Sequence, residues 1–253
     1  MTSLAAASEA GTSASRRTRF PILVPILVVL ILLGVAWYIS AAQLDSVTAR
    51  MLEPSNVLRR AGEHAWIVFA STVLGVLFAL PMGILLSRRW AKYLRTPLLA
   101  IGSAAQALPS IGIIVLLALL VGTGTNTAIV AILLFSLLPL LRNTLVAIVS
   151  CPPSVTKAAA GMGMSGTQIL MRVELPLGVP VILAGWRTML VLNVGTAALA
   201  TLIGAGGLGS LIDSGMQLGR MDVVIIGSLL TASFALLIDW GASLLQRALT
   251  PRT

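Results

Sequence analysis

Few residues in this 253-residue sequence have the chemical types and spacing of a catalytic or metal site. His64 is the only histidine and Cys151 the only cysteine, and neither belongs to an H-E-x-x-H or other metal-ligand pattern. The sequence also lacks the G-x-x-x-x-G-K-S/T pattern with which a P-loop binds ATP phosphates. We therefore expect no catalytic residue, no metal and no cofactor in this chain, which disfavours a membrane enzyme.

One glycine pattern, Gly204-Ala-Gly-Gly-Leu-Gly209, matches the dinucleotide fingerprint G-x-G-x-x-G letter for letter. That fingerprint binds a nucleotide only between a strand and a helix of a βαβ unit. Here it follows a long apolar run instead. The pattern therefore predicts a tight loop at a helix end, where glycine permits positive φ angles.

Two ionisable residues, Arg187 and Asp239, lie inside long apolar runs. Counted at 1.5 Å per residue, both sit about 10 Å from the same end of their predicted helices. Charged residues inside a membrane pair with one another or mark a pathway. Their equal depth predicts an interhelical ion pair, and a pathway or gating role for either residue is the alternative. Asn193 lies deeper and is expected to form an interhelical hydrogen bond.

The apolar runs identify the bilayer as the solvent of this chain. Apolar residues make up 57% of the sequence and charged residues 10%, against about 25% charged in soluble proteins. The net charge of +9 does not indicate nucleic-acid binding, because the basic residues lie between apolar runs. Six runs can each cross about 30 Å of hydrocarbon: residues 20–40, 65–86, 97–121, 127–149, 178–203 and 223–245. We predict an all-α membrane protein with six transmembrane helices.

Prolines and basic residues refine this arrangement. Pro81, Pro109 and Pro139 lie within the runs and predict kinks rather than breaks, since neighbouring helices can re-satisfy freed backbone groups. With the N-terminus inside, thirteen of the seventeen Lys and Arg residues fall on the inner side. Both termini are then cytoplasmic, and His64 is expected to be a solvated anchor at the outer start of the second span. The chain divides into a disordered cytoplasmic segment, a first span with an outer segment, a transmembrane core and a cytoplasmic tail, at residues 1–19, 20–64, 65–245 and 246–253.

The longest interruption on the inner side is residues 157–176, KAAAGMGMSGTQILMRVELP. Three alanines precede Gly161 and Gly163, and Ser165 and Gln168 have the spacing of a capping box. The pattern predicts a short helix with a face of small residues, a glycine turn and a second helix that runs to Leu175-Pro176. A short alanine-faced helix with nothing of its own to bury suits docking in a groove on another protein.

This stretch resembles the cytoplasmic coupling loop of ABC-importer permeases, whose pattern is Glu-Ala-Ala, a glycine four residues after the Glu, and a late Leu-Pro. Five residues match: Ala158, Ala159, Gly161, Leu175 and Pro176. Lys157 stands where the family has glutamate. The likeness is strongest to permeases for glycine betaine, choline and related osmoprotectants, which carry a run similar to IGAGGLG after the fifth span.

The resemblance implies a methionine-importer-like permease fold, a type I ABC importer core of five helices, preceded here by one extra N-terminal helix. It places a coupling loop at residues 151–177, in which ATPase subunits dock on Lys157, Ala158, Ala159, Ala160, Gly161, Met162, Gly163 and Met164. Ser165, Gln168, Leu175 and Pro176 would shape the loop.

The same resemblance implies the partners and the function. ATP and magnesium would bind to the partner ATPase, and a second permease subunit, identical or different, would complete the passage. An extracytoplasmic protein would bind the substrate. The implied function is import of compatible solutes such as glycine betaine, choline, carnitine or proline across the plasma membrane of a prokaryote. An ABC permease for another small polar solute such as an amino acid, or an ion-gradient-driven secondary transporter, is the alternative. Asp239 is the only carboxylate inside a span, which disfavours the latter.

Overall fold

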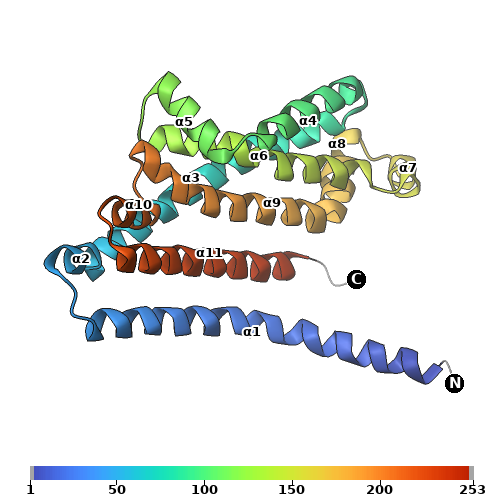
Figure 1. Cartoon of the computed structure of the whole chain (residues 1–253). Coiled ribbons are helices and arrows are strands. Elements are labelled where there is room, and N and C mark those ends of the chain that lie inside the picture. The colour runs from blue at the N-terminus through green and yellow to red at the C-terminus, as the bar shows by residue number, and fades with distance from the viewer. Residues whose placement is uncertain (1–2, 251–253) are drawn as a thin grey trace.

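The computed structural model describes residues 3–250, with side chains from residue 22 onward. Over these residues the chain forms only helices and their connections (Figure 1). The first half contains α1 (Ser3–Ala41), α2 (Ser46–Met51), α3 (Pro54–Ser87), the 3₁₀ turn η1 (Arg89–Ala91), α4 (Lys92–Ala107), α5 (Ser110–Val121) and α6 (Thr125–Val149). The second half contains α7 (Pro153–Gly161), α8 (Gly166–Ile169), the π-helical η2 (Leu170–Glu174), α9 (Leu175–Ala197), the 3₁₀ segment η3 (Ala198–Ile203), α10 (Gly209–Gln217) and α11 (Met221–Leu249). The all-α prediction is confirmed.

Five helical segments are long and apolar enough to cross a membrane: Ile22–Ala41, Pro54–Ser87, Thr125–Val149, Gly166–Ile203 and Met221–Leu249. The pair α4 and α5 provides a sixth candidate only when both helices are counted as one span, because they are bent by 97°. The structure therefore agrees with the prediction of six spans when α4 and α5 are counted together as one span.

The break between α4 and α5 corrects the prediction of a kinked single helix over residues 97–121. Leu108 leaves the helical region with ψ of 141°, and Pro109 becomes the cap of α5. The residue before a proline is disfavoured in the α conformation, so this proline ends the helix. Pro81 and Pro139, by contrast, remain inside α3 and α6.

Helix α6 lies at the centre of the bundle and packs along α3 and α9. The close approach of α3 and α9 to α6 depends on glycines in α3 and α9. A Cβ atom added at Gly83, Gly178 or Gly185 would lie 2.6 to 2.9 Å from side-chain carbons of α6. Small residues at helix crossings are the usual means of packing in membranes, since they let backbones meet.

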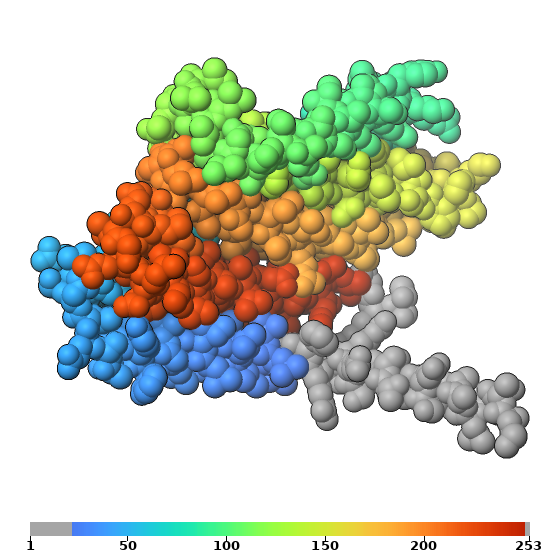
Figure 2. Space-filling model, in the orientation of Figure 1, coloured from blue at the N-terminus to red at the C-terminus, as the bar shows by residue number. Residues whose placement is uncertain are grey.

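The N-terminal helix lies beside α11 at the edge of the bundle (Figures 1 and 2). It begins at Ser3, which differs from the disorder predicted for residues 1–19. Alanine has the highest intrinsic helix propensity, and residues 5–7 are all alanine. At the other terminus α11 continues to Leu249, beyond the predicted start of the tail at residue 246.

The described starts and ends of these helices place both chain termini at the end of the bundle that carries α7 (Figure 1). We call this the loop end. Helices α2 and α10 lie at the opposite end, which we call the far end. The described ends of α1 and α11 thus lie at the same end of the bundle as α7, which belongs to the predicted coupling loop at residues 151–177, hereafter the docking loop.

Candidate docking site

Helix α7 projects from the loop end of the bundle (Figure 1). It begins at Pro153, a residue favoured at the first helical position because its missing N–H needs no partner there. Ala159 is 2% exposed and faces the rest of the loop. Of the eight residues predicted to dock an ATPase, Met164 is half-buried and six are exposed: Lys157, Ala158, Ala160, Gly161, Met162 and Gly163. The exposed residues in the second half of α7 are thus small and apolar apart from Lys157, while Ser154 adds an exposed hydroxyl near the start of the helix.

The turn after α7 is a Schellman motif, and its key residue is Gly163. The N–H of Gly163 donates to the Ala160 carbonyl at 3.0 Å, and the N–H of Met164 donates to the Ala159 carbonyl at 3.2 Å. Gly163 has a φ of +84°, which favours glycine. Gly161 ends α7 in ordinary helical geometry, with nothing within 4 Å of an added Cβ. Two glycines were predicted to form this turn, but only Gly163 is required by the backbone.

The capping box predicted at Ser165 is present. The Ser165 N–H donates to Gln168 Oε1 at 2.8 Å, and the Gln168 N–H donates to Ser165 Oγ at 3.4 Å. The predicted end at Leu175-Pro176 is wrong, because α8, η2 and α9 continue as one helical segment. The π-helical turn that ends at Glu174, two residues before Pro176, explains this continuity, since widening the helix there accommodates a residue without an N–H.

One arginine attaches this segment to α3, and a second attaches α4 to the same end of α3. Arg88 Nη2 donates to Glu174 Oε2 at 2.8 Å, which joins the end of α3 to η2. Arg95 of α4 donates to the carbonyls of Leu86 and Ser87, and so caps the end of α3. None of these contacts is predicted by the residue patterns in the sequence. The one available indication was opposite charges at the inner ends of two apolar runs, and this does not specify a partner.

Deeper in the membrane part, the predicted pair of Arg187 and Asp239 is confirmed. Arg187 Nε lies 2.7 Å from Asp239 Oδ1, and Arg187 Nη2 lies 2.8 Å from Oδ2. The pair is therefore bidentate and joins α9 to α11. Asn193 makes the expected interhelical hydrogen bond, from Nδ2 to Thr72 Oγ1 at 2.9 Å.

His64 is not the solvated anchor that its sequence position suggested. Its side chain is completely buried, and its ring lies edge-on to Phe234 with centroids 5.1 Å apart. Helix α3 begins at Pro54, so His64 lies almost three turns inside it rather than at its start. Residues 54–64 are mostly polar, so this first part of the helix is not included in an apolar run identified by hydropathy.

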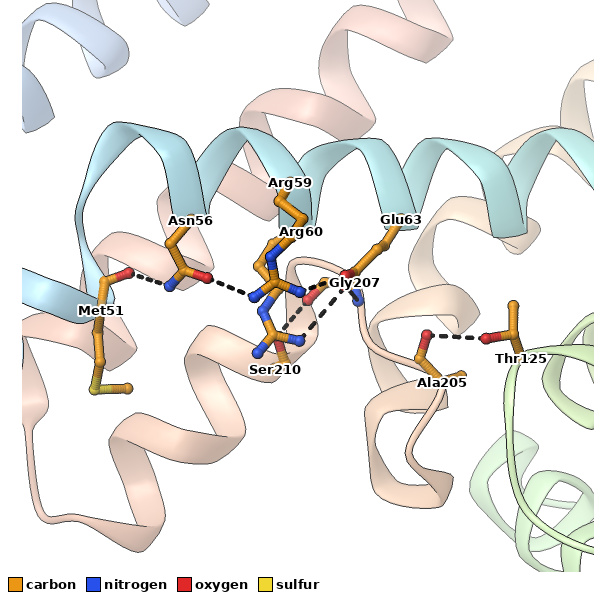
Figure 3. A network of polar contacts seen from close by, with 9 residues as sticks. All are labelled: Met51, Asn56, Arg59, Arg60, Glu63, Thr125, Ala205, Gly207 and Ser210. Atoms are coloured by element: carbon orange, nitrogen blue, oxygen red, sulfur yellow. Dashed lines mark hydrogen bonds and ion pairs between the residues drawn. The ribbon is translucent and has the colours of Figure 1, made fainter.

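The glycine run forms the tight loop that was predicted. Gly204, Gly206 and Gly207 all have positive φ angles, between 74° and 85°. Figure 3 shows this loop held by α3: Glu63 Oε2 accepts a hydrogen bond from the Gly207 N–H at 3.0 Å. Arg59 in turn contacts Glu63 Oε1 at 2.7 Å. The loop is a structural connection at the far end of the bundle. Among the described residues, no group of three His, Cys, Asp or Glu side chains forms a candidate metal site.

Residues 75–252 match the family model of the binding-protein-dependent transport system inner membrane component. Two curated relatives extend the likeness over most of the chain. The osmoprotectant import permease protein OsmY of Salmonella typhimurium is 39% identical over 225 residues, which are 89% of this chain and 94% of OsmY. The glycine betaine/carnitine/choline transport system permease protein OpuCB of Bacillus subtilis is 35% identical over 197 residues, covering 78% of this chain and 90% of OpuCB.

Among solved structures, an inward-facing conformation of the MetNI methionine ABC transporter contains a chain of similar fold. The TM-score is 0.69 at 24% sequence identity, and the match covers 82% of this chain and all of that one. The shared fold is the helical bundle described above.

Proposed function

The chain belongs to the family of binding-protein-dependent transport system inner membrane components, and from this premise we propose that it imports compatible solutes with the help of separate ATPase subunits. The relatives named for osmoprotectants, glycine betaine, carnitine and choline support this class of solute. Glycine betaine and carnitine are zwitterions, and choline is a cation. All three contain a quaternary ammonium group.

The observation that carries the proposal is the exposed helix α7 and its attachment to the bundle. Ala158 and Ala160 of this helix and its C-cap Met162 are exposed, Met162 at 72%, and together they offer an apolar surface to a groove on an ATPase. The Schellman turn and capping box fix its angle to the next helix. A force applied to α7 by an ATPase would then displace α7 and the following helix together as a rigid unit.

The path from this helix into the membrane is short. The segment Gly166–Ile203 runs without interruption from the docking loop to the far end of the bundle. Arg88 couples the same segment to α3. Closure of two ATPases would move both structures together and rock the bundle between two packings, a rigid-body switch of the kind common in transporters.

Two further partners complete the proposal. A second permease subunit, identical or different, would form the passage together with this chain, and an extracytoplasmic binding protein would deliver the solute at the far end. The excess of Lys and Arg among the loop-end connections supports a cytoplasmic placement of this end and of both termini.

The test is purification of the affinity-tagged chain from its native membrane, followed by reconstitution of the complex in proteoliposomes. We expect an ATPase subunit to co-purify and radiolabelled glycine betaine uptake to require ATP inside the vesicles. Uptake should continue after ionophores collapse the ion gradients. The control is the same complex with an ATPase subunit that binds but does not hydrolyse ATP. Uptake that stops with the gradients while ATP remains would identify a secondary transporter instead.

A further inference from the structure

We propose that Arg187 and Asp239 form a weak binding site for zwitterionic solutes, in which Asp239 faces the ammonium group and Arg187 binds the carboxylate. This inference rests on the proposed function, and it adds a preference for zwitterions over simple cations. It assigns to one ion pair a role beyond joining two helices.

The first reason is the exposure of the pair. Both residues lie within candidate membrane spans, yet each side chain is 37% exposed. Charged side chains in contact with hydrocarbon are costly and are found facing water or protein. This face of α9 and α11 is therefore expected to border a passage or a second subunit rather than lipid.

The second reason is the groove beside the pair. It has a volume of about 420 Å³, a size suited to a small solute. Besides the two charged residues, Thr188 and Gln246 contribute polar side chains, and Val191 and Leu192 contribute apolar ones. A larger groove of about 630 Å³ between α3, α9 and α11 is lined by Phe69, Trp186 and Phe234 but offers no charged group among its lining residues. Only the smaller groove presents both signs of charge.

The third reason is the unused bonding capacity of the pair. Arg187 employs Nε and Nη2, so within the described residues its Nη1 makes no hydrogen bond. A guanidinium nitrogen of this kind can donate two N–H groups to a carboxylate. Each Asp239 oxygen accepts one hydrogen bond from the described residues, and a carboxylate oxygen has the capacity to accept a second.

These features favour a zwitterion for an electrostatic reason. A solute with an ammonium group and a carboxylate can approach both partners at once without leaving a charge unmatched in a medium of low dielectric. A cation such as choline could approach Asp239 only beside the positive charge of Arg187. The affinity should be low in either case, because the solute competes with a bidentate pair that is already satisfied. Low affinity suits a passage, in which a solute must also leave.

The experiment uses the complete reconstituted transporter and measures uptake of radiolabelled glycine betaine and choline together with ATP hydrolysis. The main variant is Arg187→Gln with Asp239→Asn, which keeps hydrogen-bonding groups and strands no charge. We expect the ratio of glycine betaine to choline uptake to fall about tenfold, the effect of losing one charge-assisted hydrogen bond. ATP hydrolysis stimulated by the binding protein should persist. Arg59→Gln, at the far end of the bundle, is the matched control and should leave the ratio unchanged.

A second variant keeps the inference testable if the double variant does not fold. Arg187→Lys keeps both charges but loses the planar donor fork, and it should also lower the ratio. An unchanged ratio in a folded variant overturns the inference, as does equal loss of both solutes with dissociation of the complex, which would indicate a subunit contact. A parent transporter that imports choline but no zwitterion overturns the inference and leaves the proposed function standing. Import of neither solute refutes the proposed function itself.

Discussion

Arg88 and Glu174 are 86 residues apart in the sequence, and their side chains meet at 2.8 Å. Glu174 is the last residue of the π-helical turn in the docking loop, directly before α9, and Arg88 caps α3. The carboxylate is well covered, with a side-chain exposure of 14%. This ion pair is the described link through which a movement of the loop would reach a second membrane helix.

Breaking the Arg88–Glu174 ion pair should uncouple ATP hydrolysis from solute import. Glu174→Gln is expected to leave ATPase subunits bound, because α7 is untouched, but to lower the amount of solute imported per ATP hydrolysed. Both quantities are measured in proteoliposomes. Arg89→Gln is the control, since Arg89 is exposed and forms no ion pair within the described residues. Unchanged stoichiometry in Glu174→Gln would remove this ion pair from the coupling path.

The two glycines of the docking loop should respond differently to substitution. Gly163→Ala places a Cβ atom at a φ of +84° and should destabilise the loop by about 1–2 kcal/mol. A Cβ atom added at Gly161 meets no atom within 4 Å in this chain, so we expect Gly161→Val to keep the fold while the bulkier surface blocks ATPase binding. Limited proteolysis of the loop and ATPase co-purification distinguish the two effects. Full ATPase binding by Gly161→Val would show that this side of α7 does not face the ATPase.

Cys151 provides a pH-dependent probe of the same region. Burial, followed by the negative charge of Glu174, raises the pKa of the Cys151 thiol above its ordinary value. The reactive thiolate is then scarce at neutral pH, and maleimide labelling should accelerate only at a higher pH than for an exposed thiol. Glu174→Gln removes one cause and should move the labelling curve to lower pH. Stopped-flow labelling across a pH series measures both curves, and coincident curves would contradict the proximity of the two residues.

The stability of the Arg187–Asp239 pair can be measured separately from its proposed role in transport. Asp239→Asn strands the arginine charge between membrane helices and should lower the midpoint of thermal unfolding. Adding Arg187→Gln should restore part of the loss, because removing one partner of a half-buried pair within the membrane leaves the other charge unmatched, whereas removing both does not. Thermal unfolding in detergent gives the four corners of this cycle. Strictly additive losses would mean that the pair contributes no coupling energy.

Lys157 allows a test of the docking interface itself. The resemblance to ABC-importer permeases implies glutamate at this position, whereas this chain presents an exposed lysine. We expect Lys157→Glu to change ATPase affinity and its salt dependence, since the charge faces the proposed partner. Stronger binding would favour a transporter in which another permease subunit normally carries the intact glutamate. Unchanged affinity at every salt concentration would place position 157 away from the interface.

The sequence by itself determined the features that depend on local chemistry. Apolar length identified the spans, because a helix must cover the hydrocarbon thickness with apolar residues. The spacing of Ser165 and Gln168 predicted the capping box, because both partners lie within one helical turn. Equal depth in their helices was enough to predict that Arg187 meets Asp239, since a charge within the membrane requires a partner.

Features that depend on packing between distant segments can be seen only in the folded structure. A proline can kink, break or leave a helix intact according to what surrounds it, so Pro109 ends α4 while Pro176 follows a π-helical turn inside a continuous segment. His64 is buried because the ring of Phe234 and the loop at Gly207 cover it from elements more than 140 residues away in the sequence. The partner of Glu174 also depends on how α3 lies beside the docking loop. Such contacts are set by the geometry of helix packing, which no local pattern of residues records.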